Sequence, residues 1–380
     1  MKRTTGTFKV THVGGEEIRA FIPLPLPPKD PCLALDGLRA PLTRAEEALQ
    51  RLDLAGDMIP SMDWFLYAFV RKEAVLSSQI EGTQSTLMDL LESEVHEGTP
   101  EDPDLQEVCA YLAAQEHGWR ELERGDGLPI CMRLLSEIHG KLLQSSRGST
   151  KQPGEIRRTQ NWLGGTRPGN ASFVPAPPDQ LPGLLGEFEH AIHGPSDLPA
   201  LIRIGLLHVQ FETLHPYLDG NGRLGRLLIT LLLREWKLLS QPLLYMSLYL
   251  KTHQQEFYRR LHTVRSEGDW ESWLQFFLEG VAETAQNAAD TAKSLHNVVS
   301  NCRKALQARP DVTVLSLRLF ELLPAHPILN TNRAIALLEC TRPAAIKALS
   351  VLEQAEVLAP LGTGKNNRMM AFEPYLKHLR

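Results

Sequence analysis

Between about residues 36 and 305 the apolar positions recur mainly at helical spacing, which predicts a predominantly α-helical chain. An acidic segment at 94–104 and a segment rich in proline and glycine at 163–180 interrupt this pattern and are expected to be loops. The segment 199–213 is apolar on nearly every side, so we expect a helix buried in the centre of the fold. Its single histidine, His208, is therefore expected to be a core residue rather than a ligand.

The two ends of the chain depart from this pattern. Residues 1–30 alternate weakly and end in a proline-rich run, which predicts a short hairpin and an extended arm. In the tail, 312–323, 332–339 and 343–355 have helical spacing, and 357–372 is typical of two short strands around a basic tip. This order resembles a winged helix, a DNA-binding architecture. The residues expected on or beside its recognition helix are Thr341, Arg342 and Lys347, and those on the wing are Lys365 and Arg368.

Charge weighs against DNA as the partner of this tail. Residues 311–380 hold eight Lys and Arg against six Asp and Glu, a net charge of +2. A protein that binds the phosphate backbone needs a stronger positive surface. We therefore favour a protein-docking or dimer-supporting role for the tail and keep DNA binding as the alternative.

The whole chain carries a net charge of −5, which gives no attraction to nucleic acid or anionic membranes. The five cysteines are far apart and form no Cys-x-x-Cys pair, so neither a disulfide framework nor a zinc site is expected. The N-terminus has no apolar core typical of a signal peptide, and the apolar run 227–233 is too short to cross a bilayer. We expect a cytoplasmic protein.

The densest chemistry lies in one stretch, His215-Pro-Tyr-Leu-Asp-Gly-Asn-Gly-Arg-Leu-Gly-Arg226. A glycine-rich turn is followed by a strongly apolar run, which predicts a helix that begins near Gly222. Unpaired N–H groups and the positive end of the helix dipole make such a turn an anion site. Arg223 and Arg226 are three residues apart, so they share a helix face and can both reach phosphate oxygens.

Two further side chains in this stretch suit phosphate chemistry. Asp219 precedes the turn, where its carboxylate could hold magnesium against the phosphates. His215 has a reference pKa near neutrality and suits a general base. Each residue alone is more often structural, for example a helix cap or a surface charge. Their combination favours a nucleotide site, and no Walker-type phosphate loop competes with it.

The stretch resembles the Fic motif, His-Pro-Phe-x-Asp/Glu-Gly-Asn-Gly-Arg-x-x-Arg, and departs from it only at Tyr217. Most Fic proteins are adenylyltransferases, which transfer AMP from ATP to a protein hydroxyl. The resemblance implies that His215 deprotonates the acceptor hydroxyl and that Asp219 binds magnesium. The positions that it assigns to ATP binding in this stretch are Gly220, Asn221, Gly222, Arg223, Leu224, Gly225 and Arg226.

A second segment resembles the Fic inhibitory motif, Ser/Thr-x-x-x-Glu-Gly/Asn. It runs from Ser77 through Glu81 to Gly82, at the end of an amphipathic run at 64–76. The resemblance implies that Glu81 pairs with Arg226 and keeps this arginine from the γ-phosphate. Without the downstream motif the segment would be an ordinary helix end with a C-terminal glycine.

A third segment, 165–178, contains the turn Pro168-Gly169-Asn170 between short apolar pieces, which predicts a hairpin. In Fic proteins a hairpin flap at this place clamps the target segment beside the nucleotide, and its edge could bind an extended peptide. The flap residues that we expect near the nucleotide are Asn170, Ser172 and Phe173. Phe257, Tyr258 and Arg265 follow the motif where the family lines the adenine.

These patterns predict a mainly α fold, with a Fic-type helical core, a small β-hairpin flap and a C-terminal winged helix. The expected domains are an N-terminal arm and inhibitory-helix region (1–110), a Fic catalytic domain (111–305) and a winged-helix-like domain (311–380). The favoured function is an autoinhibited adenylyltransferase that uses ATP and Mg²⁺ to modify a Ser, Thr or Tyr of a protein, including itself.

Three alternatives stay open at this point. The first is a nucleotide-sensing regulator that binds DNA through the winged helix. The second is a de-AMPylase in which Glu81 positions water, and the third is transfer of phosphocholine or phosphate. The sequence identifies neither the target protein nor the oligomeric state, and a homodimer is one candidate.

Overall fold

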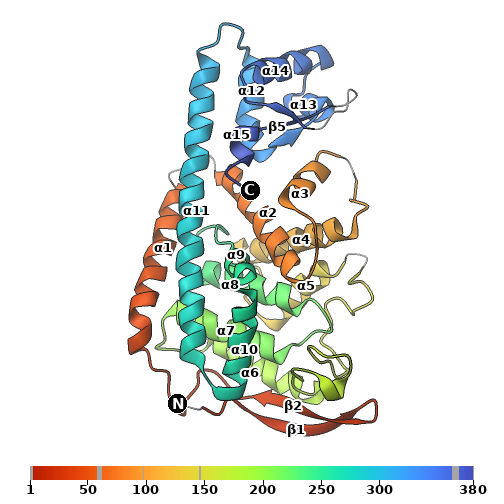
Figure 1. Cartoon of the computed structure of the whole chain (residues 1–380), viewed down its shortest axis with the longest axis vertical. Helices are drawn as coiled ribbons and strands as arrows, with labels where there is room; N and C mark the ends of the chain where they lie inside the picture. The colour runs from red at the N-terminus through yellow and green to blue at the C-terminus, as the bar shows by residue number, and fades with distance from the viewer. Residues whose placement is uncertain (1–2, 58–61, 97, 145–146, 362–367, 380) are drawn as a thin grey trace.

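The computed structural model describes residues 3–57, 62–96, 98–144, 147–361 and 368–379 of an elongated, mainly helical chain (Figure 1). One long helix, α11 (Trp270–Gln307), runs along most of its length. At 1.5 Å per residue its 38 residues span about 57 Å. The Asp269 side chain accepts the N–H of Ser272 and caps its N-terminus. This helix connects the lower helical core to the C-terminal unit.

Two helices at the centre of the core carry the residues on either side of the motif loop. They are α7 (Ala200–Leu214) and α8 (Asn221–Glu235), and both are buried along most of their length. Because α7 is apolar nearly all round, it packs against α6, α8 and α11 at once, which confirms the predicted central helix. His208 is buried, and its Nδ1–H donates to the carbonyl of Gly225 at 3.0 Å, so it is the core histidine expected.

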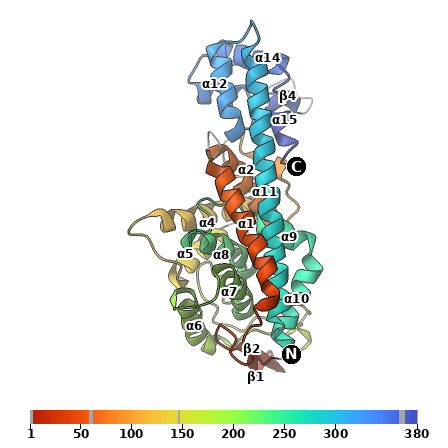
Figure 2. The ribbon, with the colours of Figure 1, turned by 90° about the vertical axis from the view of Figure 1, so that its left-hand side faces the viewer.

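The remaining core helices surround this pair. Figure 2 shows α1 side by side with α11, in agreement with their extensive contact. The predicted boundary at residue 110 between the first two domains lies inside α4, and this helix continues across it. The surrounding helices are α1 (Arg39–Asp57), α2 (Met62–Ile80), α3 (Leu87–Ser93), α4 (Pro103–Glu123), α5 (Met132–Leu142), α6 (Leu181–His193), α9 (Met246–Thr252) and α10 (Gln254–Glu267).

The N-terminal hairpin predicted from the alternating pattern is confirmed. Strands β1 (Gly6–Val13) and β2 (Glu16–Pro23) pair antiparallel with Phe8 opposite Phe21. Arg3, just before β1, donates to the carbonyl of Gly268 at 2.7 Å and pairs with Glu271 at 2.8 Å. These contacts fasten the arm to the start of α11.

The predicted hairpin at 165–178 is wrong in its secondary structure. The segment is a loop with an isolated bridge between Leu163 and Phe173 and a 3₁₀ turn at Pro168–Asn170. The reason is local, because the Oδ1 atom of Asn170 accepts two main-chain N–H groups that a ladder would use, both at 3.0 Å. The prolines at 175, 177 and 178 remove further donors. We call residues 163–178 the flap.

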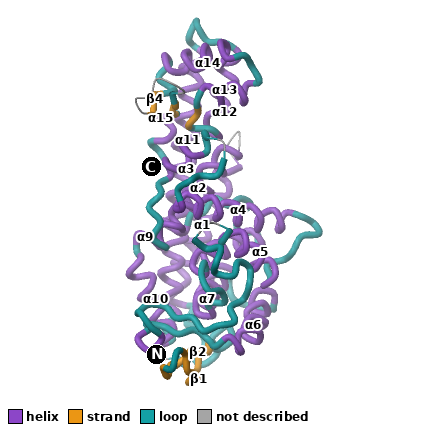
Figure 3. Tube along the Cα trace, turned by 90° about the vertical axis from the view of Figure 1, so that its right-hand side faces the viewer, coloured by secondary structure: helices purple, strands orange, loops and turns teal. Residues whose placement is uncertain are grey.

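The tail forms the helices and strands expected, with one strand that the sequence pattern did not indicate. The extra strand is β3, and the sheet has the order β3-β5-β4. Figure 3 colours the short strands of this unit orange. Lys365 lies outside the described residues. The elements are α12 (Val314–Leu322), a 3₁₀ turn η4 (Leu323–Ala325), β3 (Ile328–Leu329), α13 (Thr331–Leu338), α14 (Arg342–Gln354), β4 (Ala359–Leu361), β5 (Met369–Ala371) and α15 (Glu373–Leu376).

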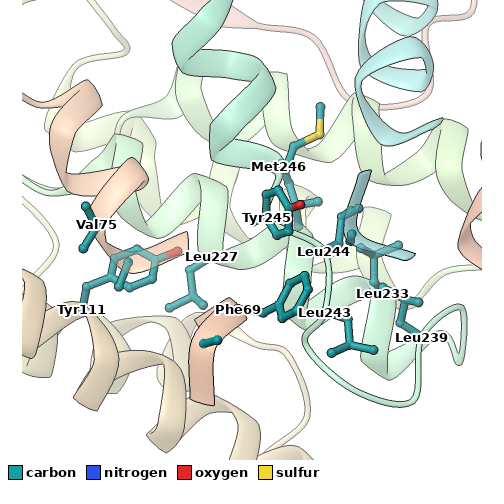
Figure 4. Packing of buried hydrophobic residues seen from close by; sticks show 14 of the residues in the cluster. Phe69, Val75, Tyr111, Leu227, Leu233, Leu239, Leu243, Leu244, Tyr245 and Met246 are labelled. Carbon is teal, nitrogen blue, oxygen red and sulfur yellow. The ribbon is translucent and has the colours of Figure 1, made fainter. Parts of the chain in front are cut away.

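This C-terminal unit packs on α2 through η4 and on α3 through β3. The rings of Tyr67 on α2 and His326 after η4 lie 6.3 Å apart. On the other side of α2, Phe69 packs against Tyr245, with ring centroids 5.4 Å apart (Figure 4). The helix that carries the predicted inhibitory segment is therefore packed between the core and the C-terminal unit. Among the described residues, no helix is both long and apolar enough to cross a bilayer.

Two glycines on core helices should respond in opposite directions to alanine. A Cβ at Gly205 on α7 would lie 2.8 Å from Leu274 and 3.1 Å from Phe277, so Gly205→Ala overpacks the contact with α11. We expect it to lower the free energy of unfolding by about 1–3 kcal/mol. Gly186→Ala on α6 has open space and should raise that free energy by about 0.5–1 kcal/mol. Urea unfolding followed by circular dichroism measures both, and equal effects would contradict the packing.

Candidate functional site

The motif loop is closed by the side chain of Asn221. Its Oδ1 accepts the N–H of Tyr217 and its Nδ2 donates to the carbonyl of the same residue, both at 2.9 Å. Gly220 precedes it with φ 75°, a left-handed conformation that favours glycine. The loop then enters α8 with its first N–H groups free of helical partners. The side chain of Asn221 thus holds the loop of the predicted anion site in shape through its two bonds to Tyr217.

His139 on α5 holds this loop through a hydrogen bond to the main chain. Its Nδ1 accepts the N–H of Gly154 at 2.9 Å, so Nε2 carries the proton and donates to the carbonyl of Asp219 at 2.9 Å. Its ring stacks on Tyr217 with centroids 3.8 Å apart. Burial lowers the pKa of His139 to about 4, which keeps the ring neutral in this role. His139 was not predicted from the sequence, because a lone histidine in an amphipathic helix has no distinguishing pattern.

Arg157 holds the loop from the other side and was also missed. The residue is buried, and its Nε donates to the carbonyl of His215 at 2.9 Å. Its guanidinium also donates to the carbonyl of Ala176 in the flap, so it links flap and motif. In the part of the chain that the structure describes, its partners are main-chain carbonyls rather than carboxylates, and burial lowers its pKa to about 10. A buried arginine in a loop gives no signal in the sequence.

His215 follows α7 in a left-handed conformation, with φ 47°. Its Nδ1 is buried without a hydrogen-bond partner among the described residues. Burial, together with the charges of Arg265 and Arg157, lowers the pKa of His215 to about 3. The ring is therefore neutral at physiological pH and available to accept a proton.

The structure brings Arg265 and Phe173 together beside His215. Arg265 donates to Thr213 Oγ1 at 3.1 Å and to the carbonyl of Glu212 at 3.2 Å, one turn before the histidine. Its guanidinium lies 4.0 Å from the centroid of the Phe173 ring. Two residues predicted to lie near the nucleotide, one from the flap and one from α10, thus meet at the end of α7.

The other candidates outside the motif have different environments. Phe257 is buried in the core, whereas Tyr258 is 49% exposed. The Asn170 side chain accepts the main-chain N–H groups of the flap turn described above. Ser172 is exposed and donates its N–H to the carbonyl of Leu163. The proximity of Asn170, Ser172 and Tyr258 to a nucleotide stays a prediction.

The side chain of Arg226 is bonded by Ser77 and Glu81. It is buried, and Nε donates to Ser77 Oγ at 2.9 Å. Its Nη2 donates to the carbonyl of Ser77 at 2.9 Å and to Glu81 Oε1 at 2.7 Å. Burial alone would raise the pKa of Glu81, but the charge of Arg226 holds it below its usual value, so the pair is ionised. The end of α2 therefore uses three of the five donors of this arginine.

Glu81 also lies against the start of α8. A Cβ built on Gly222 would clash with Glu81 Oε1, so the carboxylate rests on the glycine. Gly82 follows it in the turn after α2, with φ 105°, and donates its N–H to the carbonyl of Gln79. The carboxylate thus occupies the N-terminal end of α8, where an anion is favoured.

Arg223 is held by a different carboxylate. Its Nη1 donates to Glu107 Oε2 on α4 at 3.1 Å, and its Nη2 lies 3.9 Å from Asp219 Oδ1. Leu224 is fully buried in the core, and Gly225 faces Glu212 on α7. Of the seven motif positions predicted to bind ATP, Leu224 and Gly225 therefore face the protein interior.

Asp219 is the one motif carboxylate that could hold a metal. Its side chain is 46% exposed, and Oδ1 accepts the N–H of Gly220 at 2.6 Å. No group of three acidic, His or Cys side chains that could hold a metal occurs among the residues described. This donor set fits Mg²⁺, which binds one or two carboxylates together with phosphate oxygens and water.

Comparisons with known proteins agree with this architecture. Residues 39–120 match the Fic/DOC family N-terminal region, and residues 129–233 match the Fic/DOC family. The chain is 29% identical over 160 residues to "Protein adenylyltransferase Fic" of Drosophila grimshawi, which covers 41% of this chain and 30% of that protein. It is 31% identical over 158 residues to the protein of the same name from Culex quinquefasciatus, covering 41% and 28%. The chain thus spans less than a third of the length of these curated relatives.

Solved structures share the fold. A Fic family protein from Desulfovibrio desulfuricans superposes with a TM-score of 0.57 at 19% identity, covering 90% of this chain and 97% of that one. A Fic domain containing signaling protein from Bacteroides thetaiotaomicron has a TM-score of 0.51 at 17% identity, covering 67% and 97%. The mainly helical Fic fold is thereby confirmed, and the chain belongs to the Fic/DOC family.

The site makes one prediction that is independent of any activity. We expect the His215 ring to stay neutral down to about pH 4, because burial and two arginines disfavour its charged form. Since the unfolded chain takes up this proton near pH 6.5, His215 lowers the stability of the fold as pH falls from 6.5 toward 3. Histidine NMR titration, with His215→Gln to assign the signal, measures this pKa. A midpoint near 6.5 would refute the buried environment.

Proposed function

We propose that this protein is an autoinhibited protein adenylyltransferase, which transfers AMP from ATP to a Ser, Thr or Tyr hydroxyl of a protein, including itself. The observation that carries the proposal is the motif loop, in which the neutral ring of His215 after α7 lies with the N-terminus and the two arginines of α8. The names of the curated relatives support the same reaction. The intact glycine turn and arginines favour it over transfer of phosphocholine or phosphate.

In the proposed reaction the acceptor oxygen attacks the α-phosphorus of ATP, its proton passes to the ring of His215, and pyrophosphate leaves. A base with a pKa of about 3 would be weak. The bound triphosphate brings several negative charges close to the ring, and these raise its pKa toward neutrality. The N–H groups at the start of α8 and the side chain of Arg223 stabilise the charge on the phosphates.

Asp219 is the residue that would hold Mg²⁺ beside these phosphates, and the ion would neutralise the charge of the leaving pyrophosphate. His139 supports the proposal, because its bond to the carbonyl of Asp219 fixes the main chain at this residue, while the Asp219 side chain stays 46% exposed. The main-chain bond from Gly220 leaves the second carboxylate oxygen free for a ligand.

Autoinhibition follows from the position of Glu81. The carboxylate lies on Gly222 and pairs with Arg226, so it takes both the space and the charge partner of an outer phosphate. A hydrogen bond between charged groups is worth about 1.5–3 kcal/mol. The contact is therefore strong enough to compete with a phosphate and weak enough to be released by a binding partner.

The first test of this function is incorporation of label from ATP marked on the α- or the γ-phosphate, with Mg²⁺ present. We expect label from α-ATP only. Glu81→Gly should raise the rate on the order of tenfold to a hundredfold, because it frees Arg226 from a contact of about 1.5–3 kcal/mol. His215→Ala should abolish labelling in either background.

The other outcomes decide between the alternatives. Label from γ-ATP would indicate phosphate transfer. Absence of label in Glu81→Gly, with cell lysate supplied as acceptor, would exclude the transferase. Release of AMP from a pre-labelled protein, lost in Glu81→Gly, would instead support the de-AMPylase.

The magnesium assignment has a separate test. In the Glu81→Gly background, Asp219→Asn should raise the Mg²⁺ concentration needed for half-maximal labelling on the order of tenfold, because the charged protein ligand is lost. Asp126→Asn, on the exposed loop after α4, is the matched control and should leave the Mg²⁺ dependence unchanged. Equal curves for both variants would exclude Asp219 as the ligand.

For residues 311–380 the winged-helix assignment and the partner remain proposals. The winged-helix assignment is supported by the order of helices and strands. It is also supported by the exposed positions of Thr341, Arg342 and Lys347 at the start of α14. Arg368 is exposed but pairs with Glu353 at 3.1 Å. Because the net positive charge of this unit is small and Arg368 is paired, protein docking or dimerisation is the favoured role, and DNA binding is the alternative.

A further inference from the structure

The inhibitory contact depends on the position of α2 along its axis. Ser77 lies in the last turn of α2 and Glu81 follows directly after the helix, and both bond Arg226. A slide of α2 by a single residue would move them by about 1.5 Å. Such a shift exceeds the range over which a hydrogen bond keeps its strength. Some contact must therefore fix α2 along its axis.

One turn before Ser77, Glu73 makes such a contact. Its side chain is buried, with 3% of the residue exposed. Oε2 accepts the N–H of Ser247 at 3.1 Å, and Oε1 accepts the hydroxyl of the same residue. The hydroxyl of Tyr111 on α4 lies 3.5 Å from Oε1. A buried carboxylate with fixed donors on two neighbouring helices has little freedom to shift.

Ser247 gives this contact a second role. It is the second residue of α9, which has no side-chain cap from its own N-cap residue, Tyr245. The carboxylate of Glu73 therefore satisfies a free N–H at the start of α9 and lies at the positive end of its dipole. The inhibitory helix thus supplies the cap of the helix on which it packs.

Two further bonds continue the same seam toward Glu81. Lys251 on α9 donates to Gln79 Oε1 at 2.6 Å, and Gln254 at the start of α10 donates to the carbonyl of Ile80 at 3.3 Å. These two contacts involve partly exposed groups, whereas the Glu73 contact is fully enclosed. Glu73 is therefore the strongest fixed point between α2 and the α9–α10 segment.

We propose that Glu73 is a positioning residue of the inhibitory helix, which fixes α2 on α9 and thereby keeps Glu81 on Arg226. The inference rests on the proposed function for its effect on catalysis, but its structural part does not. Neither the inhibitory motif nor the catalytic motif contains Glu73, and nothing in the amphipathic pattern of 64–76 distinguishes it from a surface glutamate.

The test compares wild type, Glu73→Ala, Glu73→Gln, Glu81→Gly and the double variant Glu73→Ala/Glu81→Gly. We expect Glu73→Ala to raise labelling from α-ATP on the order of tenfold, since it removes the buried hydrogen bonds with Ser247. Glu73→Gln can still accept the Ser247 N–H and donate to its hydroxyl, so it should keep most of the inhibition. The double variant should label like Glu81→Gly, because an inhibitor that is absent cannot be mispositioned.

A second readout does not require activity. Hydrogen–deuterium exchange of the amides of residues 71–82 should be faster in Glu73→Ala than in wild type, while exchange in α7 stays unchanged. Ser247→Ala removes one of the two donors without touching α2, and should give the same change at smaller amplitude. It also serves as the test if Glu73→Ala does not fold.

The outcomes separate this inference from the proposed function. If Glu81→Gly labels but Glu73→Ala and Ser247→Ala label like wild type, with unchanged exchange in α2, Glu73 does not position the helix. If Glu81→Gly does not label, the transferase proposal fails, and the exchange measurement alone decides on Glu73. Equal activation by Glu73→Ala with and without the Glu81→Gly substitution would also overturn it, because the effect would then act on catalysis itself.

Discussion

The bonding of one buried arginine connects the parts of this structure that matter for function. Arg226 lies in α8, one turn from the free N-terminus of that helix, and its donors are divided between Ser77 and Glu81 at the end of α2. A guanidinium cannot lose its charge in this environment, so it must have an anion or carbonyl partner. In the observed state α2 supplies that partner. In the function that we propose, a phosphate takes its place only when Glu81 moves away from Arg226.

The same constraint explains how the rest of the chain is arranged. Because α2 must present Ser77 and Glu81 at one position, it is packed against the core through Phe69 and against the C-terminal unit through Tyr67. The motif loop is held just as firmly by His139 and Arg157, which bond its carbonyl groups. The helix before Glu81 and the loop before Arg226 are thus both held by residues distant in sequence.

A large part of the fold and site could be predicted from local patterns. The central helix α7, the start of α8 and the N-terminal hairpin were correct, because each depends on hydrophobic periodicity or on glycine at a turn. The flap was wrong, because Asn170 satisfies N–H groups that a hairpin would pair. The strand β3 was missed, because two residues are too short to show alternation. Site residues such as Phe257 were placed by family resemblance, and the core environment of that ring became visible only in the structure.

The sequence by itself determined the family and indicated the chemistry that we propose, since a twelve-residue motif places a histidine, a glycine turn and two arginines within one loop and helix start. Such neighbours along the chain stay neighbours in any fold. Only the tertiary structure decided which residues hold that motif in place. His139, Arg157, Glu107 and Glu73 come from separate helices and loops, and their types alone predict surface positions as readily as buried ones. Their roles arise from burial, which turns an ordinary polar side chain into one that must find a fixed partner.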